Sequence, residues 1–234
     1  MGLKELRKDL RKEADREQAL ILQRFFKTGK GGYGEGDKFY GIKVPVQRKI
    51  AKKHRDIAPP DIRELLNSPV HEERLVGLFI LVDQYTGSDD KAKEKLFRFY
   101  LKNTKNINNW DLVDLSAPKI IGAHLLNRDK NILFKLAESE NLWEKRIAIL
   151  STYTFIKNNH FDTTFRISKI LLNDTHDLIH KGVGWMLREV GNQNLEEEEK
   201  FLKKHYKTMP RTMLRYAIEK FPEERRKAYL KGNI

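Results

Sequence analysis

The sequence predicts an all-α protein, a solenoid of HEAT-like helical repeats whose stacked helices form a concave basic face. Apolar residues recur at helical spacing through nearly the whole chain, as Leu3, Leu6 and Leu10 do in the first segment. Stretches of strict alternation are short, so we expect no β-sheet. A similar segment also recurs at intervals close to those of paired-helix repeats. An irregular helical bundle is the alternative that this pattern leaves open.

The repeat is carried by four segments that share one hydrophobic pattern. Their equivalent positions are Arg74, Asp111, Arg146 and Lys181, which are 37, 35 and 35 residues apart. Positions one, two, five and six residues after each of these are mainly apolar and should face the core. A second helix fits between successive segments, at residues 89–105, 129–138 and 162–172. We therefore expect a single domain that spans residues 1–234.

Caps and prolines mark where the predicted helices begin. Asp15, with Gln18 three residues later, predicts the start of a helix that runs through Phe26. The seven prolines mostly fall at plausible helix starts. Residues 28–39 form the only glycine-rich stretch, and it lacks the Gly-Lys-Ser/Thr ending of a phosphate-binding P-loop. We interpret it as a flexible turn.

The charge balance points to a polyanionic partner. Lys and Arg number 46 against 33 acidic residues, a net charge of +13, which favours nucleic acid first and an anionic membrane second. The charge is spread through helical segments, as expected for a folded basic face, although a basic but inert surface would give the same count. The chain has no cysteine, no apolar signal region and no run long enough to span a membrane. We expect a cytoplasmic monomer.

Four side chains fall opposite the predicted core positions, at offsets that stack on one face of neighbouring repeats. They are Trp110, Asp114, Arg146 and Trp185. Each alone has an ordinary explanation, because tryptophans pack between repeats and exposed charges form surface ion pairs. Their occurrence in successive repeats favours a functional surface where two indoles, a carboxylate and a guanidinium converge.

Four segments resemble the AlkD-type DNA alkylation-repair glycosylases, and the similarity runs over nearly the whole chain. They are residues 39–45 (FYGIKVP), 109–114 (NWDLVD), 141–150 (NLWEKRIAIL) and 184–189 (GWMLRE). The resemblance implies removal of cationic N3- and N7-alkylpurines from double-stranded DNA, in base excision repair, without flipping the base into a pocket.

The resemblance also assigns roles to individual residues. Trp110, Asp114 and Trp185 match the catalytic cleft of the family, and Arg146 matches its phosphate-contacting arginine. Lys43 and Arg48 match positions that touch the DNA backbone. Next to them, Val44 departs from the usual threonine. We expect Lys181, at the repeat position equivalent to Arg146, to lie on the same DNA-binding face.

The chemistry is consistent with a single carboxylate. An alkylated cationic purine is already a good leaving group, so it needs no general acid, whereas O-glycosidases use two carboxylates. Asp114 would stabilise the developing oxocarbenium sugar and orient or deprotonate water. The tryptophans would hold the cationic nucleotide, and Arg146 would anchor a phosphate.

No cofactor or metal is expected. His176 and His180 have the spacing of a zinc motif but lack a third ligand, and an aspartate replaces the glutamate of that motif. Activity should therefore survive EDTA. Two other functions remain open: a non-catalytic helical-repeat protein that binds DNA or RNA, and a protein-interaction scaffold. The positive charge argues against the scaffold. Asp114 argues against the pure binder, because a carboxylate in a phosphate-facing groove weakens binding.

Overall fold

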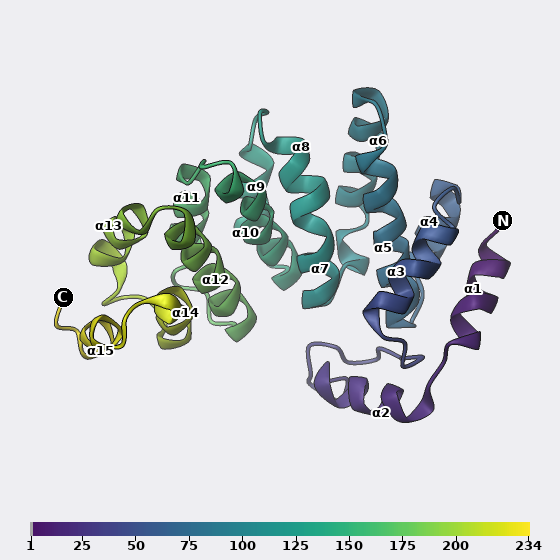
Figure 1. The fold of residues 1–234 in the computed structure, drawn as a ribbon, viewed down its shortest axis with the longest axis horizontal. Coiled ribbons are helices and arrows are strands. Elements are labelled where there is room, and N and C mark those ends of the chain that lie inside the picture. Colours follow the sequence, from purple (N-terminus) through teal and green to yellow (C-terminus); the bar gives the residue numbers. More distant parts are fainter. Residues whose placement is uncertain (1) are drawn as a thin grey trace. The chain divides into compact units, whose positions relative to one another are not determined.

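All regular secondary structure in the part of the chain that the structure describes, residues 2–234, is helical (Figure 1). This computed structural model contains one isolated β-bridge in that range, between Lys38 and Val70, and no strand. Within the same range, no helix is both long and apolar enough to cross a membrane. The prediction of an all-α helical-repeat fold is confirmed.

The helices fall into two compact units, one that reaches to Ser116 and one that spans Ala117–Ile234. The prediction of one domain over residues 1–234 stays a prediction. The first unit contains α1 (Leu3–Lys12), α2 (Arg16–Phe25), α3 (Val44–Lys53), α4 (Pro59–Leu66), α5 (His71–Thr86), α6 (Asp90–Lys102), a 3-10 turn (Thr104–Asn106) and nearly all of α7 (Trp110–Ala117).

The second unit begins with a π-helical turn (Pro118–Gly122) and continues through α-helices and one 3-10 turn to the C-terminus. Its elements are α8 (Ala123–Leu125), α9 (Asn131–Ala137), α10 (Leu142–Lys157), α11 (Asp162–Ile170), α12 (Asp177–Gln193), α13 (Leu195–His205), α14 (Arg211–Ala217), a 3-10 turn (Ile218–Lys220) and α15 (Glu223–Lys231). Helices α6, α9 and α11 occupy the three intervals in which the sequence predicted a second helix.

The centre of the first unit is α5, which packs against α3 and α4. The predicted core positions Leu75, Val76, Phe79 and Ile80 are all at most 4% exposed. Nearly every residue of α5 is buried, as expected for a helix that is apolar on most of its circumference. The Asp15 cap is also confirmed, since its side chain accepts hydrogen bonds from the first turn of α2.

The second unit is organised around α10 and α12, which pack against each other. Ile147 and Ala148 are fully buried on α10, as the repeat pattern predicted. The π-helical turn packs on α10 so closely that a Cβ on Gly122 would lie 2.3 Å from the Ser151 carbonyl oxygen. Glycine is therefore required at this contact.

Pro118 is an exception to the prediction that prolines mark helix starts. Pro45 and Pro59 do lie in the first turns of α3 and α4. Pro118 lies inside a helical run that begins with α7 and ends with α8, where the backbone turns from α to π. Proline has no N–H to donate and its ring clashes with the carbonyl four residues earlier, so the helix widens there. The Thr154 hydroxyl donates to the Pro118 carbonyl at 2.6 Å.

Candidate functional site

The first two turns of α7 carry two of the predicted catalytic residues. Trp110 is the first residue of the helix, Asp114 lies about one turn later, and both are partly exposed. Local hydrogen bonds hold the first turn, because the Asn109 side chain accepts from the Trp110 N–H and the Asp111 side chain accepts from the Leu112 N–H, each at 2.8 Å. The helix therefore presents the indole and the carboxylate on adjacent turns.

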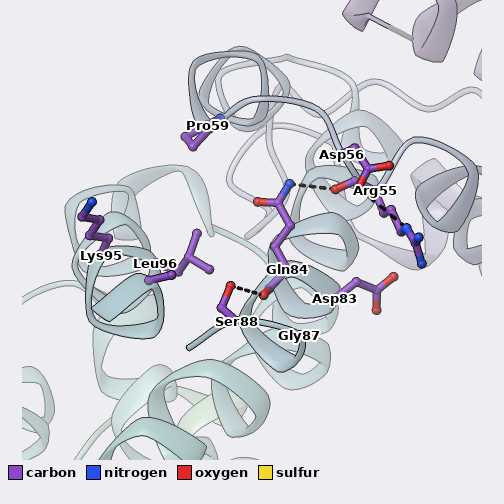
Figure 2. A pocket seen from close by; sticks show the side chains of 10 residues that line it. Arg55, Asp56, Pro59, Asp83, Gln84, Gly87, Ser88, Lys95 and Leu96 are labelled. Atoms are coloured by element: carbon purple, nitrogen blue, oxygen red, sulfur yellow. Dashed lines mark hydrogen bonds and ion pairs between the residues drawn. The ribbon is translucent and has the colours of Figure 1, made fainter. Parts of the chain in front are cut away.

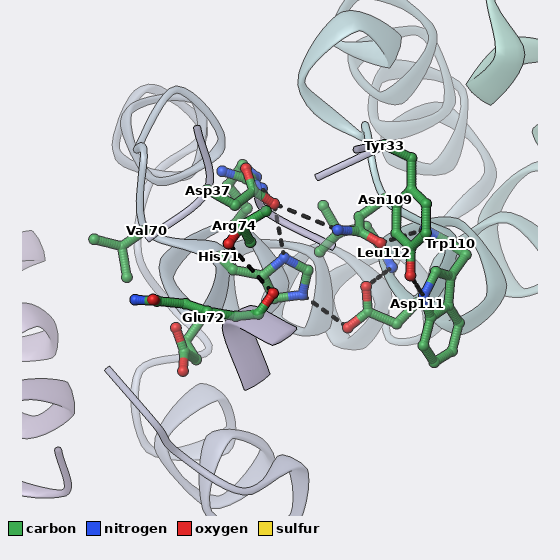
Figure 3. Close-up of polar contacts among 12 residues, drawn as sticks. Tyr33, Asp37, Val70, His71, Glu72, Arg74, Asn109, Trp110, Asp111 and Leu112 are labelled. Carbon is green, nitrogen blue, oxygen red and sulfur yellow. Dashed lines mark hydrogen bonds and ion pairs between the residues drawn. The ribbon is translucent and has the colours of Figure 1, made fainter. Parts of the chain in front are cut away.

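The Trp110 ring is held by aromatic neighbours at the end of α2 and by the glycine-rich loop. Phe26 stacks on it with ring centroids 5.3 Å apart, and the exposed Phe25 meets it edge-on at 5.9 Å. The indole Nε1–H donates to the hydroxyl of Tyr33 at 3.2 Å (Figure 3). Packing thus accounts for part of the Trp110 surface, and the remainder stays accessible.

A buried polar network centred on His71 lies beside Trp110 (Figure 3). His71, which is 2% exposed, contacts Asp111 through Nε2 at 2.8 Å and Asp37 through Nδ1 at 3.4 Å. Arg74 pairs with the same Asp37 oxygen at 2.7 Å. Asp111 therefore holds a neighbouring buried side chain, that of His71. The network links the glycine-rich loop, α5 and the start of α7.

Charge within this network favours a protonated histidine. Burial by itself lowers the pKa of His71, but the attraction of Asp111 and the hydrogen bonds to Asp111 and Asp37 outweigh it and raise that pKa to about 9. Burial likewise opposes ionisation of Asp37, yet its contacts with His71 and Arg74 hold the pKa of this carboxyl below its ordinary value. At neutral pH, therefore, an imidazolium lies between two carboxylates.

The imidazolium also packs against aromatic rings. The centroids of Phe26 and Phe39 each lie 4.8 Å from the His71 ring, and Phe26 in turn stacks on Trp110. A cation against an aromatic ring is attractive. Protonation of His71 therefore strengthens the packing on which Trp110 rests.

Glu72, the neighbour of His71, fixes the segment that leads into α3. Its fully buried carboxylate accepts hydrogen bonds from the backbone N–H groups of Tyr40, Gly41 and Ile42 at 3.0, 2.8 and 3.2 Å. The N-cap of α3 follows directly at Lys43, which is exposed. This arrangement gives the first turn of α3 a fixed backbone with an exposed positive charge.

The remaining predicted contact on α3 is Arg48. Its side chain is exposed, and its guanidinium carbon lies 4.1 Å from the centre of the Phe79 ring. Stacking on an aromatic face restricts the guanidinium without using its N–H donors. The geometry is compatible with contact to a phosphate, and the DNA-backbone roles of Arg48 and Lys43 stay predictions.

In the second unit, Trp185 lies partly exposed on α12. Its indole Nε1–H donates to Glu189 at 3.2 Å, and Lys157 contacts the other oxygen of this carboxylate at 3.0 Å. Burial opposes ionisation of Glu189, but the Lys157 hydrogen bond and charge hold its pKa below the ordinary value. The ring of Tyr153 lies 6.3 Å from that of Trp185. Trp185 therefore donates its N–H to an ionised carboxylate.

The two basic residues predicted in this unit have different environments. Arg146 is only 4% exposed, and its Nη1 donates to the Leu178 carbonyl of α12 at 2.6 Å. Lys181 is partly exposed and pairs with Asp177 at 2.7 Å, one turn earlier on the same helix. The Arg146 contact ties α10 to α12. The phosphate-binding roles of Arg146 and Lys181 stay predictions.

The histidine pair on α12 has local structural roles. The Nδ1 of His176 accepts from the Leu178 N–H at 3.1 Å and caps the helix, while His180 contacts the Asp174 carbonyl at 2.5 Å. Among residues 2–234, no three histidine or acidic side chains are grouped so that they could hold a metal ion.

Apart from these residues, a pocket of about 590 Å³ lies beside the end of α5 and the start of α4 (Figure 2). Its polar groups mostly serve the fold. The Gln84 amide donates to the carbonyls of Arg55 and Ile57 at 2.7 and 2.9 Å, and the Ser88 hydroxyl donates to the Gln84 carbonyl. We assign no function to it.

The structure thus groups the predicted residues within each unit. Trp110 and Asp114 share α7, whereas Arg146 lies on α10 and contacts α12, the helix of Trp185 and Lys181. The convergence of the two groups stays a prediction. The sequence did not predict the side chains that hold the two indoles, the first turn of α7 and the backbone segment that leads into α3. These are Tyr33, Asp37, His71, Glu72 and Glu189.

Comparison with known proteins identifies the family. The family described as DNA alkylation repair enzymes matches residues 6–221. The chain belongs to this family. A solved structure titled "Predicted DNA alkylation repair enzyme from Enterococcus faecalis" is similar over 90% of this chain and 98% of its own, with a TM-score of 0.68 and 15% identity. That likeness shows the shared fold. A comparison with curated proteins gave no match.

Membership of the family sets the broad function. The chain is a DNA alkylation repair protein, and DNA is the partner that this role implies. The resemblance that the sequence indicated is confirmed at this level.

Proposed function

We propose that this DNA alkylation repair protein is a glycosylase that hydrolyses the N-glycosidic bond of cationic N3- and N7-alkylpurines in duplex DNA. The observation that carries the proposal is the start of α7, where a partly exposed indole and a partly exposed carboxylate lie one turn apart. The indole N–H of Trp110 already donates to Tyr33, which favours contact through the ring surface. Such a pair suits a positively charged nucleotide.

The reaction requires few catalytic groups from the protein, because the cationic purine is already a good leaving group. Water attacks C1′ of the deoxyribose as the bond from C1′ to the purine nitrogen breaks, and the base departs as a neutral purine with the electron pair of that bond. The sugar carries positive charge in the transition state. Asp114 stabilises that charge and orients or deprotonates the water. Trp110 and Trp185 hold the cationic nucleotide, and Arg146 anchors a phosphate.

The proposal also includes a wider DNA-binding face, and the oligomeric state, location and cofactor requirement of the protein. Lys43, Arg48 and Lys181 contribute positive charge to backbone contacts, which position the duplex without reading its sequence. The protein acts as a monomer in the cytoplasm, without a metal or other cofactor. The family supports the DNA-binding part of this statement, and the rest is proposed with it.

The decisive experiment is release of 7-methylguanine from methylated duplex DNA by wild-type protein and by Asp114→Asn. The substitution keeps size and hydrogen bonding but removes the charge, so excision should fall by roughly 100-fold or more, about 2.7 kcal/mol. DNA binding should hold or improve, because a carboxylate repels phosphates. Asp162→Asn is the matched control, since that side chain is 84% exposed on α11.

Two further variants separate rate from binding. Trp110→Ala should lower the rate because the ring surface that holds the cation is lost, whereas Arg146→Ala should weaken both binding and rate. Near wild-type excision by Asp114→Asn would move the chemistry to another residue. Wild-type protein that binds duplex DNA but releases no alkylpurine would instead be a non-catalytic DNA binder.

A further inference from the structure

The glycine-rich loop that follows α2 folds back onto the end of that helix. A Cβ on Gly32 would lie 1.8 Å from the Lys27 carbonyl oxygen, and one on Gly34 would lie 2.5 Å from that of Phe26. The Glu35 carboxylate accepts from the Gly31 N–H at 2.8 Å. Glycines at these positions allow the loop to approach the helix closely, and this approach places the large side chain of Tyr33 beside Trp110.

The Tyr33 hydroxyl joins the end of α2 to the start of α7. It accepts the indole N–H of Trp110 at 3.2 Å (Figure 3). It also donates to the Phe25 carbonyl at 3.3 Å. The two roles use different parts of the hydroxyl, so both hydrogen bonds can form together. The loop thereby holds the indole edge at a fixed point.

Aromatic packing alone does not determine the direction in which the N–H edge of an indole points. Phe26 stacks on the face of Trp110, but either face of an indole can make a stack of this kind, and a half-turn about the second side-chain torsion exchanges the two faces. That half-turn would move the N–H to the opposite side. A hydrogen-bond acceptor at one side selects a single orientation, and Tyr33 supplies that acceptor.

We propose that Tyr33 is a positioning residue that draws the indole N–H of Trp110 away from the lesion and so leaves the ring surface to meet the cationic nucleotide. This inference rests on the proposed glycosylase function. The N–H is the positive end of a bond dipole, and it would repel a positively charged purine or sugar that it faced. With the N–H bound to Tyr33, the nucleotide meets the electron-rich face of the ring.

The test is a double-mutant cycle between Tyr33→Phe and Trp110→Phe. Tyr33→Phe removes one hydroxyl and should lower the single-turnover excision rate of 7-methylguanine by about 3- to 10-fold, the usual worth of one hydrogen bond, with little change in DNA affinity. In the Trp110→Phe background no N–H remains, so Tyr33→Phe should have no further effect. Tyr206→Phe is the control, because that hydroxyl contacts only C-terminal backbone carbonyls.

A second readout is independent of activity. The chain has three tryptophans and hence three indole N–H signals in a ¹⁵N-labelled NMR spectrum. Tyr33→Phe should shift the Trp110 signal and speed its exchange with water, and leave those of Trp143 and Trp185 in place. An unchanged Trp110 signal, an unchanged excision rate, or an equal loss in the Trp110→Phe background would overturn the inference. Wild-type protein that releases no methylpurine would refute the glycosylase function, and the Trp110 signal would still decide whether Tyr33 holds the ring.

Discussion

Deprotonation of His71 is expected to destabilise the first unit as the pH rises above neutrality. The pKa of His71 lies at about 9 in the folded protein against an ordinary 6.5. A group whose pKa is raised by folding stabilises fully below the unfolded value, and this stabilisation is lost as the pH rises through the folded value. At about 1.4 kcal/mol per pKa unit, the gap corresponds to roughly 3 kcal/mol, nearly all of it lost by pH 10.

The physical origin of the loss lies in the two carboxylates that flank the ring. A neutral imidazole no longer attracts Asp37 and Asp111 by its charge, and Asp37 keeps its ion pair with Arg74 and a hydrogen bond from the Asn109 amide. Asp111 belongs to the first turn of α7, so that turn should loosen. Trp110 is part of the same turn and stacks on Phe26, which itself contacts His71. Its environment should therefore change over the same pH range.

Two measurements check this prediction. An NMR titration of the histidine ring nitrogens should show that His71 is still protonated at pH 8. Urea unfolding should show wild-type protein losing roughly 2 to 3 kcal/mol more than His71→Gln between pH 7 and pH 10. A His71 that titrates near 6.5, or an equal pH dependence in both proteins, would refute the reasoning.

Two other predictions follow from charge. Binding to duplex DNA should weaken steeply between about 50 and 200 mM salt, because bound lysines and arginines release counterions, and salt-independent binding would contradict a basic DNA face. Burial and the nearby Glu199 raise the pKa of Glu198 to about 9, so its ionisation opposes folding as the pH rises from its unfolded value. Glu198→Gln should therefore stabilise the protein by at least about 1 kcal/mol at pH 9 and by little at pH 5, measured by urea unfolding.

Local and periodic signals made most of the fold predictable. Asp15 caps α2 because a short polar side chain can reach the free N–H groups of the first turn. Ile147 and Ala148 lie in the core because their spacing matches the helical period. Each of these inferences needs only residues within about two turns of one another.

Pairings across long stretches of chain were not predictable. His71 contacts Asp37 and Asp111, which are 34 and 40 residues away, and no repeat or motif marks those distances. The adjacent His71 and Glu72 at the start of α5 gave a weak signal of such pairings. Both side chains are buried, and buried charged residues need polar partners elsewhere in the chain. The widened helix at Pro118 was missed for a related reason. From the sequence alone, a proline within a helix is interpreted as the start of a new helix unless the packing that supports a continuous helix is known.

The two tryptophans predicted to contact the lesion share a chemical feature that their positions in the sequence do not reveal. Each indole N–H already has an acceptor, the Tyr33 hydroxyl for Trp110 and the Glu189 carboxylate for Trp185. Both rings therefore offer a nucleotide their faces and not a donor, which suits a positive charge better than the hydrogen-bonding edge of a neutral base. An ionised acceptor also polarises the N–H and makes the ring more electron-rich, which strengthens attraction for a cation. Trp143, by contrast, is only 8% exposed and belongs to the core. The two partly exposed indoles are thus the ones whose chemistry fits cationic alkylpurines.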